Sequence, residues 1–70
     1  MLPSIPVDFN NRDEDGAVRL TTRGTLRWLE ECSLPLTGGQ SVCITDDELT
    51  VDAVVEARSG YWVAMIVRYL

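Results

Sequence analysis

The chain has 70 residues, enough for one domain, and its 11 acidic and 6 basic residues give a formal net charge of −5. Hydrophobic residues make up 46% and charged residues 24%, a balance that excludes a disordered tail, a collagen-like chain and a multidomain enzyme. The longest apolar run, Trp62 to Val67, is far shorter than the roughly 20 residues of a membrane span, and the acidic charge disfavours nucleic acid as a partner.

Alternating apolar residues predict two strands near the N-terminus. In the first, Ile5, Val7 and Phe9 alternate with polar or proline positions, which favours a short edge strand. Residues 17–22 repeat the alternation after a polar turn. We expect this second strand to pair with the first.

Residues 25–32 are the segment that predicts a helix. Thr25 can cap it, because the threonine hydroxyl can accept a hydrogen bond from an otherwise unpaired N–H of the first turn. Leu26 and Leu29 fall on one face of this helix. Such a short helix is not stable alone, so it has to be held by packing against the rest of the fold.

Three further strands are predicted over residues 41–45, 49–58 and 61–69. Residues 49–58 alternate apolar and polar positions, as in an antiparallel sheet that turns one face to water. Residues 61–69, in contrast, are apolar on both faces.

The whole chain, residues 1–70, is thus expected to form a single mainly β (α+β) domain of about five strands and one short helix. We expect a small antiparallel, strongly bent sheet or a small barrel. The stretch from Gly39 to Ala64 resembles an SH3-like small barrel. This is a likeness of architecture, and it transfers no functional residues to the chain.

The connection between the last two strands leaves two registers open. A three-residue loop over 58–60 would use Gly60 in the left-handed conformation, whereas a two-residue loop of Ser59 and Gly60 would exchange the faces of the last strand. We expect the three-residue loop because Gly60 fits it well. That register gathers four apolar residues on a face that otherwise suits water: Val54, Trp62, Ala64 and Ile66.

This apolar surplus is the main indication of function. Either the helix or the N-terminal strand covers the row, or the row binds another protein chain, with a second copy of the same chain as one candidate partner. The functional hypothesis is therefore a small non-enzymatic protein-interaction module whose candidate interface is Val54, Trp62, Ala64 and Ile66.

Two alternatives rest on charge. Arg19, Arg23 and Arg27 form a basic island that could bind an anionic ligand or nucleic acid, although the surplus carboxylates of the chain also offer partners for arginine. The chain could instead be an acidic mimic of nucleic acid. That hypothesis predicts five carboxylates on one surface: Asp46, Asp47, Glu48, Asp52 and Glu56.

Residues 11–16 resemble the start of an EF-hand calcium loop, with Asn11, Asp13 and Asp15 as weak candidate ligands. The twelfth loop position is Thr22 instead of glutamate, and the entering segment is a proline-bearing strand and not a helix. An acidic turn is therefore the favoured interpretation.

The chain offers little for catalysis, because it contains no His and no Lys. The commonest general base and the amine nucleophile are thus absent, and two cysteines alone do not make a zinc site. We expect no enzyme activity and no cofactor.

The N-terminus has no signal-peptide pattern, and Cys32 and Cys43 are expected to be free thiols, so we expect a cytoplasmic location.

Overall fold

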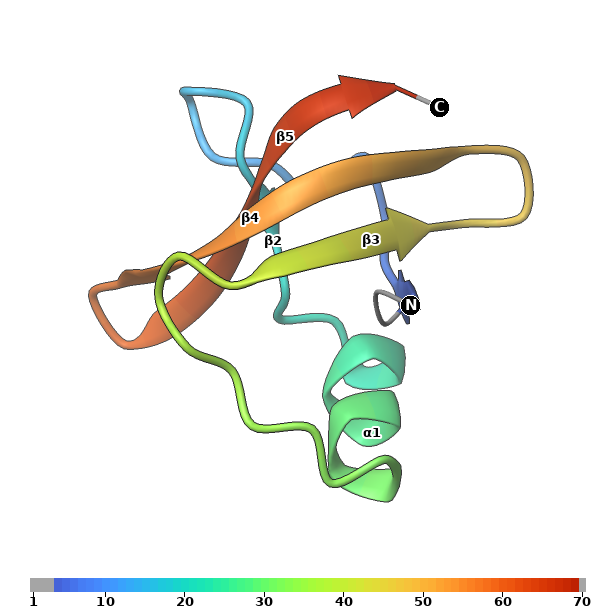
Figure 1. The fold of residues 1–70 in the computed structure, drawn as a ribbon, viewed down its shortest axis with the longest axis vertical. Helices are drawn as coiled ribbons and strands as arrows, with labels where there is room; N and C mark the ends of the chain where they lie inside the picture. The colour runs from blue at the N-terminus through green and yellow to red at the C-terminus, as the bar shows by residue number, and fades with distance from the viewer. Residues whose placement is uncertain (1–3, 70) are drawn as a thin grey trace.

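The sheet curls into a half-barrel with one short helix beside it (Figure 1). The structure is a computed structural model, and it describes residues 4–69. The elements follow in chain order: β1 Ser4–Pro6, β2 Val18–Arg19, α1 Arg23–Glu31, β3 Ser41–Thr45, β4 Thr50–Arg58 and β5 Tyr61–Tyr69. The predicted mainly β fold is therefore confirmed, and the curled five-stranded sheet is consistent with a small SH3-like barrel.

Strands β3, β4 and β5 form an antiparallel meander, and the order across the whole sheet is β1-β3-β4-β5-β2. β1 pairs with β3 in parallel, and β2 pairs with β5. The predicted pairing of the two N-terminal strands with each other is therefore wrong. Ile5 of β1 and Val18 of β2 are both fully buried, at opposite edges of the sheet. Separating the two strands lets each edge contribute an apolar side chain to the core.

The helix begins at Arg23 instead of the predicted Thr25. Thr22 is the capping residue, and its Oγ1 accepts a hydrogen bond from the Thr25 N–H at 3.3 Å. Thr25 is buried, and its hydroxyl donates to the Pro6 carbonyl at 2.6 Å. This hydrogen bond joins α1 to β1 and contributes to the packing that so short a helix needs.

The turn between β4 and β5 has two residues, Ser59 and Gly60, because Arg58 pairs directly with Tyr61. Gly60 has a φ of +84°, in the left-handed region that favours glycine. The expected three-residue loop is therefore wrong, and the alternative register is the one found. Up to a β-bulge near Ala53, the residues of β5 lie on the face opposite to the expected one.

The core lies on the inner face of the curled sheet. Its buried side chains come from all five strands and from the residue after β2: Ile5, Val18, Leu20, Val42, Ile44, Val51, Ala53, Val55 and Ala64. Trp28 and Leu29 of α1 pack against this cluster. Within residues 4–69, no helix is long and apolar enough to cross a membrane.

Candidate functional site

The residues expected to form an interface do not share one surface. Ala64 is fully buried, and Trp62 and Ile66 pack against the core cluster. Val54 lies on the opposite, outer face of the sheet. The register found separates Val54 from the other three. A different apolar row of β5 shares its outer face: Tyr61, Val63 and Met65.

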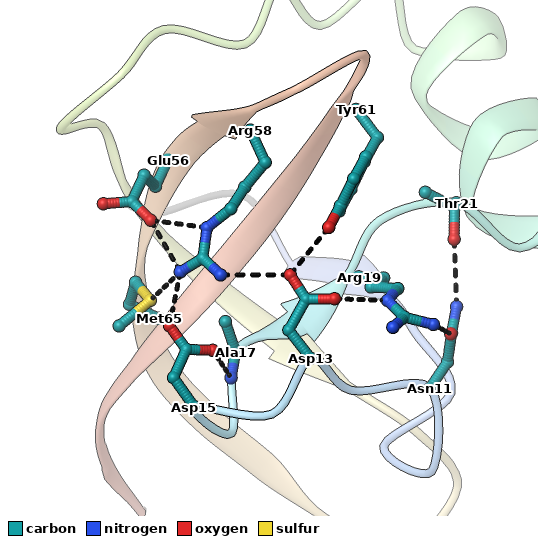
Figure 2. Close-up of polar contacts among 10 residues, drawn as sticks. All are labelled: Asn11, Asp13, Asp15, Ala17, Arg19, Thr21, Glu56, Arg58, Tyr61 and Met65. Carbon is teal, nitrogen blue, oxygen red and sulfur yellow. Dashed lines mark hydrogen bonds and ion pairs between the residues drawn. The ribbon is translucent and has the colours of Figure 1, made fainter.

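The outer row is covered by a cluster of charged side chains centred on Asp13. Val63 is fully buried although its neighbours across the sheet on this face are Arg19 and Glu56. Asp13 accepts hydrogen bonds from Arg19 Nε, from Arg58 Nη1 at 3.0 Å and from Tyr61 Oη at 2.9 Å (Figure 2). We call this set the Asp13 cluster: Asp13, Asp15, Arg19, Glu56, Arg58 and Tyr61.

Arg58 uses its whole guanidinium group inside the Asp13 cluster. Besides Asp13, it donates from Nη2 to Asp15 Oδ2 at 2.6 Å and from Nε to Glu56 Oε2 at 2.8 Å (Figure 2). The N–H of Ala17 donates to Asp15 Oδ1 at 3.1 Å, which fixes the turn that carries Asp15. The 11–17 segment is therefore attached to the β4–β5 hairpin through charge-assisted hydrogen bonds.

These contacts set the protonation states of the cluster. The hydrogen bonds from Arg19 and then Tyr61 lower the pKa of Asp13 below its ordinary 3.8. The hydrogen bonds from Arg58 and then the Ala17 N–H lower the pKa of Asp15. The pKa of Tyr61 is raised, first because its hydroxyl donates to Asp13. At neutral pH both carboxylates are therefore ionised and the phenol is protonated.

The calcium candidates lie close together, but their oxygen atoms face hydrogen-bond donors. Asp13 and Asp15 accept from arginines, and Asn11 Oδ1 accepts from Arg19 Nη1 at 3.4 Å. A cation placed among these atoms would meet the guanidinium groups that already neutralise them. In the described part of the chain, no group of His, Cys, Asp and Glu side chains is arranged to hold a metal ion.

The structure brings together only two of the three arginines of the basic island. Arg19 belongs to the Asp13 cluster, where its hydrogen bond with Asp13 raises its pKa. Arg23 and Arg27 lie on α1 and line a shallow hollow of about 660 Å³ together with three other residues: Thr21, Leu26 and Glu30. The hypothesis of one anion site built from all three arginines therefore finds no geometric support, whereas the α1 hollow keeps two of them.

The acidic residues proposed to imitate nucleic acid are partly neutralised. Asp52 pairs with Arg68 at 3.0 Å, and Glu56 pairs with Arg58 in the Asp13 cluster. Asp46 Oδ1 accepts the N–H groups of Glu48 and Leu49, both at 2.8 Å, and so shapes the turn between β3 and β4. The carboxylates therefore do not form one open acidic surface.

The C-terminal half of β5 is the longest stretch of sheet edge without a neighbouring strand. β2 pairs only with Val63 and Ala64, so among residues 4–69 no strand lies beyond this point on that side. The Leu20 N–H donates to the Trp62 carbonyl at 2.9 Å, and alternation along the strand points the backbone groups of Ile66 towards the same edge. In Figure 1 this end of β5 lies beside β4.

Cys43, one of the two free thiols, is half-buried, and its Sγ donates to Asp52 Oδ1 at 3.4 Å. Burial, followed by Asp52, raises the pKa of Cys43, so the group stays a thiol and is a poor nucleophile. Cys32 is exposed immediately after α1.

No family model, no curated protein and no solved structure matches this chain. Two of its features were not predicted from the sequence: the Asp13 cluster and the free edge of β5. The first joins residues up to 48 positions apart, as in the hydrogen bond from Tyr61 to Asp13. The second depends on how far β2 extends along β5. The acidic residues of segment 11–17 and the charge of Arg58 were the sequence signal for the cluster. Their pairing could not be predicted, because the two parts of the chain are far apart in the sequence.

Proposed function

We propose that this chain is a small non-enzymatic protein-interaction module that binds an extended segment of a partner protein along the free edge of β5. The observation that supports the proposal is the edge itself, since residues 65–69 have a strand beside them only on the β4 side. An extended peptide can add to such an edge as a further strand, with main-chain hydrogen bonds for affinity and side-chain contacts for specificity.

The side chains at this edge favour association. Within residues 4–69, three large apolar side chains are exposed, and two of them are on β5: Val67, 63% exposed, and Tyr69, 57% exposed. The candidate interface thus stays on the last strand, but it moves from Trp62 to the end of β5. Burying both side chains against a partner would remove apolar surface from water.

Two features of the edge limit indiscriminate pairing. Arg68 is a charged residue within the exposed stretch, and a β-bulge opposite Asp52 and Ala53 interrupts the regular ladder. Natural sheets use charges and bulges to protect edges from aggregation. This edge is therefore suited to a selected partner strand and not to uncontrolled stacking.

We also propose a reducing, cytoplasmic location, in keeping with the free thiols of Cys32 and Cys43.

The test compares the wild-type chain with the double variant Val67→Lys/Tyr69→Lys. Proteins captured from native lysate are identified, and each purified partner is titrated against the wild-type chain and the double variant. A sedimentation series of the chain alone shows whether a second copy of the chain is the partner. The double variant should weaken binding by about tenfold or more, because two apolar contacts are lost at the edge. Hydrogen exchange should slow at residues 65–69 on binding.

Thr37→Lys is the control, since Thr37 is exposed in the loop between α1 and β3, outside both β5 and the α1 hollow. It changes the charge at one position in the same way and should leave the affinity unchanged. Partners that bind the double variant as well as they bind the wild type would contradict the proposal, as would a strictly monomeric chain that captures no partner. Circular dichroism shows whether each variant is folded.

A further inference from the structure

The six arginines of the chain differ in how firmly they are paired. Arg19, Arg58 and Arg68 each pair with a carboxylate of another strand or loop. Among the residues between positions 4 and 69, Arg27 pairs only with Glu31 on the same helix, at 3.2 Å, and both side chains are mostly exposed. Arg23 makes no ion pair with a residue between positions 4 and 69. In a chain with 11 carboxylates, these two arginines are left available on one helix.

The two arginines share one surface hollow with an apolar side chain. Arg23 and Arg27 are one helical turn apart, so their side chains lie on the same side of α1. Both line the hollow of about 660 Å³, and Leu26, 52% exposed, lines it too. Two guanidinium groups beside an exposed leucine make a surface that is both cationic and apolar.

We infer that this α1 hollow binds an acidic peptide segment of a partner protein, one that carries two carboxylates about a helical turn apart and a leucine-like side chain between them. Each carboxylate meets one planar guanidinium donor group, which is the pairing that arginine makes best. The apolar side chain of the segment packs on Leu26. Charge complementarity selects the occupant, because the hollow is lined by two arginines and one glutamate on a chain whose net charge is −5.

Nucleic acid fits this hollow less well than a short acidic peptide. Binding to a phosphate backbone depends on many neutralised phosphates, and the hollow offers two arginines only. Glu30 lines the same hollow and Glu31 follows it, so a long polyanion would meet like charge at that end of α1. A compact acidic segment can contact Arg23 and Arg27 and stop before the glutamates.

The test titrates the full chain against a fluorescein-labelled peptide with glutamates at positions i and i+4 and a leucine between them, followed by anisotropy at low salt. Saturable binding is expected, and it should weaken as salt is added. The double variant Arg23→Gln/Arg27→Gln should bind about tenfold more weakly or worse, because two charge-assisted contacts are lost. The same peptide with glutamine in place of both glutamates should bind as weakly.

Arg12→Gln is the matched control variant. Arg12 is also exposed and lacks an ion pair within residues 4–69, but it lies over the Phe9 ring, donates to the Phe9 carbonyl and does not line the α1 hollow. It should leave the affinity within about twofold, since only the net charge changes. The inference is overturned if the peptide shows no saturable binding up to about 1 mM, if Arg12→Gln weakens binding as much as the double variant, or if single-stranded RNA binds the hollow more tightly. Val67→Lys/Tyr69→Lys should not alter peptide binding, so this result is independent of the β5 proposal.

Discussion

At the scale of single residues, Asp13 connects the most distant parts of the chain. Its carboxylate accepts hydrogen bonds from Arg19 of β2 and from Arg58 and Tyr61 of the β4–β5 hairpin. Val63, a fully buried apolar side chain on the same outer face, lies opposite Arg19 on β2 and Glu56 on β4. The side chains that pair within the cluster thus include both cross-strand neighbours of a buried apolar residue.

The cluster predicts a specific loss of stability in acid. The pKa values of Asp13 and Asp15 are lower in the folded chain than their ordinary 3.8. The stabilisation from these contacts is therefore fully present above about pH 4 and is lost as pH falls through the lowered folded-state values. Asp13→Asn should lower stability at neutral pH and flatten this acid dependence. Urea unfolding at about pH 7 and about pH 3 measures both effects.

Glu14→Gln is the control, because Glu14 is an exposed neighbour in the same turn and takes no part in the hydrogen bonds of the cluster. It should leave both the neutral stability and the pH dependence close to those of the wild type. Equal pH dependence in the wild type and in Asp13→Asn would show that the cluster does not stabilise the fold.

At the scale of elements, the three strands of the meander are the ones that the sequence predicts best. Residues 41–45 and 61–69 have the predicted bounds, and β4 begins one residue later than predicted, at Thr50. Short apolar or alternating runs bounded by turn residues mark such strands, because these signals depend on neighbouring residues only. The pairing of β1 with β3 depends on segments far apart in the chain, and no local pattern reports it.

The facing of β5 was mispredicted because one residue of loop length reverses the two faces of the strand up to the β-bulge. With Ser59 and Gly60 alone in the turn, Trp62 faces the core, and the exposed apolar surface moves to Val67 and Tyr69. The sequence allows both a two-residue and a three-residue loop. Because Gly60 takes a positive φ in either loop, the presence of this glycine does not discriminate between the two lengths. Arg23 and Arg27 share one side of a helix only because α1 begins at Arg23, two residues before the predicted Thr25.

Alanine substitution at two turn glycines should have opposite effects on stability. Gly60→Ala should destabilise the chain by about 1–2 kcal/mol, because an L-residue is strained in the left-handed region. Gly38 lies in another turn without a positive φ, and an added Cβ meets nothing within 4 Å. Gly38→Ala should therefore be neutral or stabilising by up to about 1 kcal/mol, through the unfolded state.

Thermal and urea unfolding of the two glycine variants measure the difference directly. If Gly60→Ala were as stable as the wild type, the turn would not require the left-handed conformation, and the register between β4 and β5 would have to be reconsidered.

At the scale of the whole molecule, one small core stabilises everything else. Its buried side chains come from every strand, and α1 covers it with Trp28 and Leu29. A folded domain has about 0.05–0.15 kcal/mol of stability per residue, so a chain of 70 residues has little to spare. The two proposed binding surfaces, the β5 edge and the α1 hollow, lie outside this core and can be altered without unfolding it.

Ile44→Ala is the substitution that tests the single core. Ile44 is fully buried in β3, between β1 and β4. Its truncation should cost about 2–5 kcal/mol, a large share of the total stability, with loss of all structure in one transition. Val67→Ala, at an exposed position, should change stability by less than about 0.5 kcal/mol. Separate transitions for helix and sheet signals in Ile44→Ala would contradict a shared core.

The Asp13–Arg58 contact also bears on the order of assembly. It closes a loop between residues 45 positions apart, whereas β3, β4 and β5 follow one another through short turns. Loop-closure entropy grows with sequence separation, so nearby pairings form at lower entropic cost than distant ones. We therefore expect the meander to form at lower entropic cost than the contacts of the 11–17 segment, so that Val63 becomes fully buried only when this segment docks.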